Sequence, residues 1–187
     1  MRRPRTGSSI VSSSRSLADP APSNPARDPE ANDAERRGDD ERLRDILREM
    51  CELTHMGFAA IARVTDVRWI AVQVRDEIGF GLSPGEELEL KTTICEEIRE
   101  SGQRVVIDDV DGNIEWQMHH TPIMYGFKSY ISVPLFEPDG RFFGTLCAID
   151  PSRRPLSAGD TVAMVEEMAR RAEAILAERD ASGRGDV

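Results

Sequence analysis

The chain has 187 residues, a length that suits one domain with tails. Its formal net charge of −10 argues against electrostatic binding to nucleic acid or to anionic membranes. The three cysteines are widely spaced and match neither a disulfide framework nor a zinc-binding pattern, so we expect reduced thiols in the cytoplasm and no metal site. No apolar run approaches the about 20 residues that span a bilayer.

Composition divides the chain into three parts. Residues 1–40 are rich in proline and serine and poor in large apolar residues, so we expect a disordered N-terminal tail. The last residues, 179–187, include a Ser-Gly-Arg-Gly run and are expected to form a flexible C-terminal tail. A single domain is therefore expected over residues 41–178, with a helix at each end.

Apolar residues recur at helical spacing at both ends of this domain. The first expected helix is capped by Asp39 or Asp40, and the last helix is expected to start at Ser157. Both apolar stripes are narrow, so we expect each to leave one edge uncovered by a single chain. The terminal helices are therefore predicted to pair between two copies of the chain, with Leu47 and Val165 in the seam.

Between the helices lie several strand-like runs. They cover residues 59–64, 68–75, 104–107, 128–136 and 142–149. A short helix is expected to start at Thr92 or Thr93, and residues 108–126 are expected to form a long irregular loop. Strands and helices do not alternate for long enough to build a doubly wound parallel sheet, so the pattern predicts an α+β fold with an antiparallel sheet.

Three segments resemble GAF domains. The run SYISVPLFEPDGRFFGTLCAIDP, residues 129–151, resembles their closing hairpin, with a V-P-L step, a D-G turn and G-T-L-C-A before D-P. The run ICEEIRESGQRVVIDDV, residues 94–110, is similar to the helix and short strand that precede an aspartate. The run IEWQMHHTPIMYGFKSY, residues 114–130, is similar to GAF domains attached to bacterial sensor kinases. Together the resemblance covers roughly residues 41–178.

The resemblance implies a GAF/PAS-like fold with an antiparallel sheet of about six strands. It implies helices on one face of the sheet, a small-molecule pocket on the other, and dimers through the terminal helices. It does not specify a ligand, because members bind cyclic nucleotides, bilins, haem or other small effectors. We therefore expect a stand-alone cytoplasmic sensor, not an enzyme, that signals to a second copy or to a partner such as a histidine kinase of a two-component system.

The expected loop carries the candidate ligand site. Residues 111–126 are predicted to be the lid of the pocket. The side chains expected to bind ligand are Trp116, His119, His120, Tyr125 and, below them, Tyr130. Aromatic rings are costly to leave in water, and neighbouring histidines suit a polar or anionic group. The alternative is that the aromatic rings plug an empty pocket, so that the chain is a ligand-free dimerisation module.

Two further chemistries of GAF domains fit this chain poorly. Bilin-binding GAF domains carry a cysteine just before a histidine where this chain has Met118, so we expect no covalent bilin. Free methionine-R-sulfoxide reductases have one cysteine where Cys95 lies, but their other reactive cysteines fall in the loop, where this chain has none. A thiol enzyme acting through Cys95 would therefore lack a partner thiol, and Glu96 and Glu97 are expected to raise the Cys95 pKa.

Overall fold

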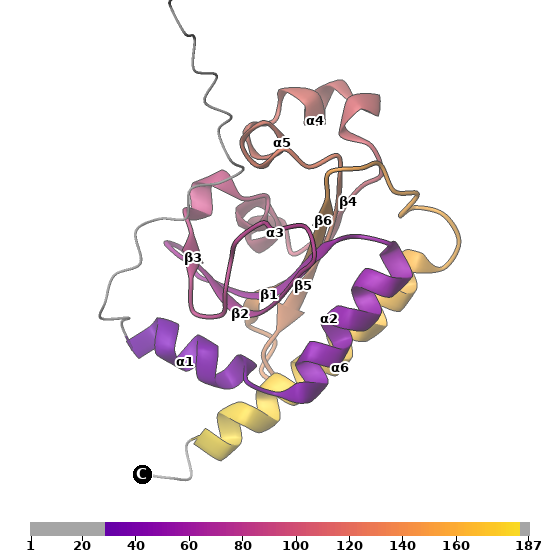
Figure 1. Cartoon of the computed structure of the whole chain (residues 1–187). Helices are drawn as coiled ribbons and strands as arrows, with labels where there is room; N and C mark the ends of the chain where they lie inside the picture. The colour runs from indigo at the N-terminus through magenta and orange to yellow at the C-terminus, as the bar shows by residue number, and fades with distance from the viewer. Residues whose placement is uncertain (1–28, 184–187) are drawn as a thin grey trace, which may run out of the picture.

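Six strands form one antiparallel sheet in the computed structural model, which describes residues 29–183 (Figure 1). The spatial order of the strands is β3-β2-β1-β6-β5-β4. Their bounds are β1 Phe58–Val64, β2 Trp69–Asp76, β3 Glu87–Leu88, β4 Val105–Ile107, β5 Ser129–Phe136 and β6 Phe142–Asp150. This confirms the predicted α+β fold with an antiparallel sheet of about six strands.

The hairpin of β5 and β6 decides which side chains lie on which face of the sheet. Its turn places Gly140 at a φ of 84°, a left-handed conformation that glycine adopts without strain. The pairing aligns Ser132 with Cys147. Because side chains alternate along a strand, Thr145 and Cys147 lie on one face, while Leu146 lies on the other.

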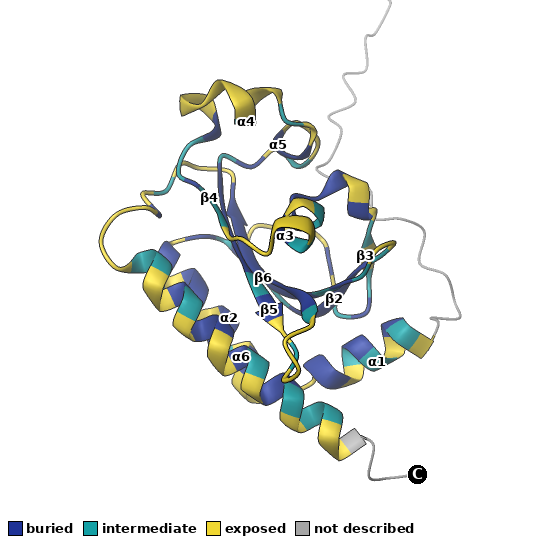
Figure 2. Cartoon of the chain, turned by 180° about the vertical axis from the view of Figure 1, so that it is seen from behind, coloured by how far each residue is buried: buried dark blue, intermediate teal, exposed yellow. Residues whose placement is uncertain are grey.

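Three helices cover the face of the sheet that carries Leu146. They are α1 (Pro29–Gly38), α2 (Glu41–Thr54) and α6 (Thr161–Gly183), and Figure 2 shows their buried sides turned toward the sheet. Asp40 caps α2 as expected by accepting the Arg42 N–H at 2.9 Å. Ser157 does not cap α6; its N–H and hydroxyl donate to the Asp108 carboxylate at 2.9 and 3.0 Å.

The two residues expected in a seam between copies are buried within the single chain. Leu47 and Val165 are both 0% exposed in the core between α2, α6 and the sheet. The prediction that they lie in an intermolecular seam is therefore wrong. The apolar stripes of the two helices are narrow, but each stripe is covered from two sides, by the other helix and by the sheet.

The described helices extend beyond the expected domain at both ends. Residues 29–38 form α1, which buries Ala31 and Ala34 in the same core, so the prediction of disorder is wrong for this part. Residues 1–28 of that prediction lie outside the described residues. At the other end α6 continues to Gly183, beyond the expected boundary at residue 178, and residues 184–187 again lie outside the described part.

Short helices cover the other face of the sheet. They are η1 (Leu90–Thr92), α3 (Cys95–Ser101), η2 (Val110–Gly112), α4 (Ile114–Met118) and α5 (His120–Tyr125). The expectations of helices on one face only and of an irregular loop over residues 108–126 are therefore wrong. Beneath these helices lies a second apolar core that includes Trp69, Ile94, Ile98, Phe127 and Ile149. No helix within residues 29–183 is both long and apolar enough to cross a membrane.

Candidate functional site

Residues 111–126, here called the cover segment, lie over one end of the second core (Figure 1). Lys128, which lies between the segment and β5, is bonded to the start of the segment. The Val110 N–H donates to the Lys128 carbonyl at 2.8 Å, and the Lys128 ammonium pairs with Asp111 at 2.7 Å. Asn113 caps α4 by accepting the Glu115 N–H at 2.8 Å. The segment thus forms two consecutive short helices, α4 and α5, and is not an open loop.

His119 and His120 fasten the cover segment to η1 and α3. His119 Nδ1 accepts the Thr121 N–H at 3.2 Å and so caps α5, while its Nε2 lies 2.7 Å from the Glu97 carboxylate. His120 Nε2 donates to the Lys91 carbonyl at 2.7 Å. These contacts use one nitrogen of His120 and both nitrogens of His119 within the protein.

Rings of the cover segment stack on one another. The His119 and His120 rings stack with their centroids 4.5 Å apart, and Trp116 lies 5.4 Å from His119. Trp116 is half-buried and packs against the second core. The structure therefore brings these three predicted site residues together near the surface, with the two imidazole rings stacked and the Trp116 ring tilted against His119.

Tyr125 lies at the edge of the second core. Its hydroxyl shares a 2.5 Å hydrogen bond with the Thr92 hydroxyl, and its ring lies 5.7 Å from that of Phe80. Burial raises the pKa of Tyr125. Phe80 is held in place by Asp76, whose carboxylate accepts the Phe80 N–H at 3.0 Å. Phe80 was not among the predicted site residues, although an aspartate followed by two nearby glycines was a usable signal for an ordered loop.

Tyr130 is buried within the second core. It is 4% exposed, stacks on Phe127 at 5.5 Å, and its hydroxyl lies 3.6 Å from Cys95 Sγ. Burial raises the Tyr130 pKa well above its ordinary value. The predicted site residues therefore fall into a group of three rings near the surface, an edge residue and a core residue.

The outer side of the cover segment is unusually apolar. Ile114, Met118, Ile123 and Met124 are 68%, 74%, 67% and 54% exposed, respectively. Single exposed apolar residues are ordinary, but four within one short segment mark a surface that gains by being covered. The sequence analysis did not identify this feature, because irregular loops have no defined inner and outer sides.

Cys95 has surroundings opposite to those expected. Its sulfur contacts the Cys147 thiol, which the sequence analysis treated as an unrelated core residue. Hydrogen bonds from Cys147 first, and then from Thr145, Tyr130 and Trp69, lower the Cys95 pKa below its ordinary range despite complete burial. The expectation that Glu96 and Glu97 raise this pKa is therefore wrong, because the sulfur points away from these surface carboxylates and into the core.

A surface hollow lies elsewhere on the molecule. With a volume of about 660 Å³, it lies between α6 and the end of β5 and is lined by Arg104, Phe136 and Glu166, among others. The Arg104 guanidinium and the Glu166 carboxylate form an ion pair across it at 2.8 Å. This hollow contacts none of the predicted ligand-binding residues.

The family model of the GAF domain matches residues 40–176. No curated protein sequence matches the chain closely enough to count as a relative. The blue-light-absorbing form of the Thermosynechococcus elongatus PixJ GAF domain is similar in structure, with a TM-score of 0.60, 14% identity, and coverage of 82% of this chain and 92% of that one. The GAF domain of an Acinetobacter phosphoenolpyruvate-protein phosphotransferase has a TM-score of 0.59 and 10% identity, covering 84% and 99%.

An enzyme shares the same architecture. The free methionine-R-sulfoxide reductase of Neisseria meningitidis, solved in complex with its substrate, has a TM-score of 0.53 and 18% identity, covering 87% of this chain and 96% of that one. At identities this low, each likeness supports the fold and carries no ligand or activity across.

Proposed function

Because the chain belongs to the GAF domain family, we propose that it is a sensory module whose input is a small molecule bound beneath the cover segment. The observation that carries this proposal is the contrast between the two sides of the segment. Its outer side exposes Ile114, Met118, Ile123 and Met124, while its inner side rests on the second core through half-buried rings. A rearrangement that turns more of this apolar surface inward around a ligand is favourable.

The contacts that hold the cover segment in place are few and near the surface. The bonds from His119 to Glu97 and from His120 to the Lys91 carbonyl are exposed to solvent. An exposed hydrogen bond contributes about 1 kcal/mol, so a modest binding energy suffices to rearrange the segment. We propose a flat ligand with a polar or anionic edge, which suits the stacked imidazole rings of His119 and His120 with the Trp116 ring beside them.

Hydrogen exchange across residues 111–126 tests the proposal. The probes are cyclic GMP, cyclic AMP, biliverdin and haemin, added to the full chain. We expect one of them to slow exchange in the cover segment, and the effect to be lost in Trp116→Ala. Val67→Ala is the matched control, because Val67 is 70% exposed in a turn far from the segment along the chain. Strong protection that no probe changes would instead support the ligand-free module with a plugged pocket.

We further propose that the signal leaves through the paired terminal helices. α2 and α6 lie side by side, joined by ion pairs from Arg42 to Glu178 and from Arg171 to Glu49 at 2.8 and 2.7 Å (Figure 1). Their outer surfaces are available to a second copy of the chain or to a partner such as a histidine kinase. The described cysteines are free thiols, which suits a cytoplasmic protein.

A thiol enzyme is the second candidate, and the contact of Cys95 with Cys147 favours it. The two sulfurs could act as nucleophile and resolving thiol. Against this, Cys95 is 3% exposed, so an amino-acid substrate does not reach its sulfur in the closed structure. We propose that the chain has no sulfoxide reductase activity, and an assay with free methionine sulfoxide should give the same background for the wild type and for Cys95→Ser.

A further inference from the structure

Two thiols lie at the centre of the second core, in an otherwise apolar environment. Cys95 is the first residue of α3, and Cys147 lies on β6 directly beneath it; they are 3% and 5% exposed. The Trp69 indole N–H donates to Cys95 Sγ at 3.3 Å. The hydroxyls of Thr145 and Tyr130 lie 3.3 and 3.6 Å from the same sulfur.

This arrangement suits a thiolate better than a thiol. The indole N–H has no acceptor capacity, so the sulfur must accept that bond, and both hydroxyls are placed to donate to it as well. Hydrogen bonds to a charged acceptor are roughly twice as strong as those between neutral groups. A hydrogen bond between the two cysteine side chains lowers the Cys95 pKa and raises that of Cys147.

We propose that Cys95 and Cys147 are a peroxide-oxidisable pair that closes into an intramolecular disulfide. The Cys95 thiolate attacks one oxygen of hydrogen peroxide, so that an S–O bond forms, the O–O bond breaks and hydroxide leaves. Cys95 is then a sulfenic acid. The Cys147 sulfur attacks the Cys95 sulfur, the S–S bond forms, and the hydroxyl departs as water with the Cys147 proton. Two thiols and one peroxide thus give one disulfide and two waters.

The pair lies close to the proposed ligand site but does not depend on it. Glu97, two residues after Cys95 on α3, is the residue that holds His119 of the cover segment. Hydrogen peroxide is small enough to reach sulfurs that a larger substrate cannot approach. Oxidation of the pair and binding beneath the cover segment are therefore separate events that can be measured independently.

Peptide mapping of the full chain tests the proposal. The protein is treated with hydrogen peroxide, its remaining thiols are alkylated after denaturation, and its peptides are identified without reduction. We expect one cross-link, between Cys95 and Cys147, that dithiothreitol reverses. Cys51 is the internal control: it is also 5% exposed, but burial raises its pKa to about 11, so it should remain available for alkylation. Oxidation of Cys51 as fast as Cys95, or cross-links only between chains, would overturn the proposal.

Two variants test the role of the hydrogen bonds. Thr145→Val removes one hydroxyl beside Cys95 and should slow cross-linking several-fold at mildly acidic pH, where the thiolate population limits the rate. Thr54→Val removes a hydroxyl that is also buried, at 4% exposed, but lies at the end of α2 on the opposite face of the sheet, and should react at the wild-type rate. Equal rates for both variants would contradict the proposed thiolate. If Thr145→Val does not fold, the presence or absence of the Cys95–Cys147 cross-link in the wild-type peptide map still tests the proposal.

Discussion

Gly38, the last residue of α1, lies directly against the backbone of Val72 in β2. A Cβ atom at Gly38 would be 1.8 Å from the Val72 carbonyl oxygen, a distance that no side chain tolerates. The Gln73 side chain donates to the Gly38 carbonyl at 2.8 Å and fixes the same approach. The N-terminal helix therefore docks on the sheet because residue 38 has no side chain.

Gly38→Ala should displace α1 while leaving the rest of the fold intact. The added methyl group must move away from the rigid backbone of β2, at a cost of about 1–3 kcal/mol. Hydrogen exchange should accelerate in residues 29–38 and remain unchanged in β5 and β6. Gly112→Ala is the control, because its Cβ would meet its nearest neighbour at an ordinary 3.7 Å. Unchanged exchange in α1 would refute this account of docking.

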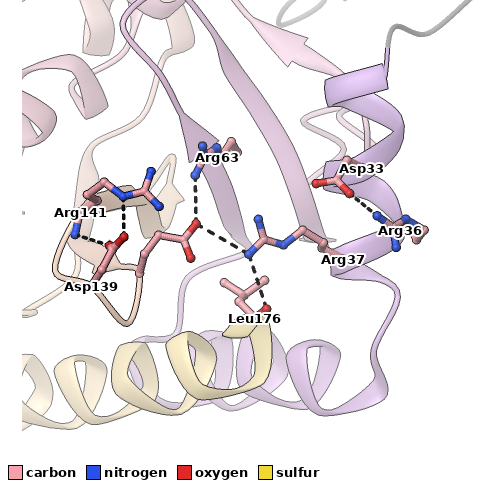
Figure 3. A network of polar contacts seen from close by, with 8 residues as sticks. Asp33, Arg36, Arg37, Arg63, Asp139, Arg141 and Leu176 are labelled. Carbon is pink, nitrogen blue, oxygen red and sulfur yellow. Dashed lines mark hydrogen bonds and ion pairs between the residues drawn. The ribbon is translucent and has the colours of Figure 1, made fainter. Parts of the chain in front are cut away.

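Arg37 is the second contact that should hold α1 in place (Figure 3). Its guanidinium lies 4.9 Å from the centre of the Phe143 ring and donates to the Leu176 carbonyl at 3.5 Å. It also lies 3.8 Å from the Glu137 carboxylate. We expect Arg37→Ala to lower the free energy of unfolding by about 1–2 kcal/mol, because it removes a largely desolvated cation–π contact and the packing of the stem.

The neighbouring Arg36 provides the matched control for this measurement. Its side chain is 58% exposed and pairs with Asp33 of the same helix. Ion pairs of this kind at the surface contribute little to stability. Arg36→Ala should therefore lower the free energy of unfolding, measured with urea, by less than about 0.5 kcal/mol. Equal losses for the two arginines would show that the buried contacts of Arg37 add nothing.

Asp40 should stabilise α2 as its N-cap in a pH-dependent way. Asp40→Ala should cost about 1 kcal/mol, whereas Asp40→Asn keeps an acceptor for the Arg42 N–H and should cost less. The side-chain hydrogen bond from Arg42 lowers the Asp40 pKa. A carboxyl with a lowered folded-state pKa stabilises the fold above its unfolded-state pKa, and this contribution is lost as pH falls through the folded-state value.

Urea unfolding at neutral and strongly acidic pH checks the linkage. The difference in free energy of unfolding between the wild type and Asp40→Asn should shrink at acidic pH, because protonation removes the charge from the wild-type carboxyl as well. A difference that stays constant, or grows, as the pH falls would contradict the pH-dependent role of Asp40.

Val165→Glu and Met164→Glu separate folding from association. Val165 is 0% exposed, so a glutamate there buries an unpaired charge and should cost more than about 3 kcal/mol. Met164 is 46% exposed on the adjacent position of α6, and Met164→Glu should leave the melting temperature nearly unchanged. Sedimentation then tests the proposed dimer: if α6 pairs between copies, Met164→Glu should shift the protein toward monomer. A fully folded Val165→Glu protein would contradict the burial seen here.

Local patterns in the sequence were sufficient for the scaffold. The strand-like runs at residues 128–136 and 142–149, and the helical spacing around Leu47 and Val165, predicted the elements, because each of these signals is visible in a single segment. The cap at Asp40 was predicted on the same grounds, since its partner is only two residues away. The segments that resemble GAF domains predicted the family, which the family model confirms over residues 40–176.

Contacts between distant segments decided the rest. Composition alone placed residues 29–38 in a tail, because nothing local reveals that Gly38 fits against Val72 or that Arg37 reaches Phe143. The sequence likewise placed Cys95 and Cys147 on separate elements without relating them. Only the packing of α3 over β6 brings these side chains together, and the hydrogen bonds to Cys95 lower its pKa in a way that its sequence neighbours did not predict.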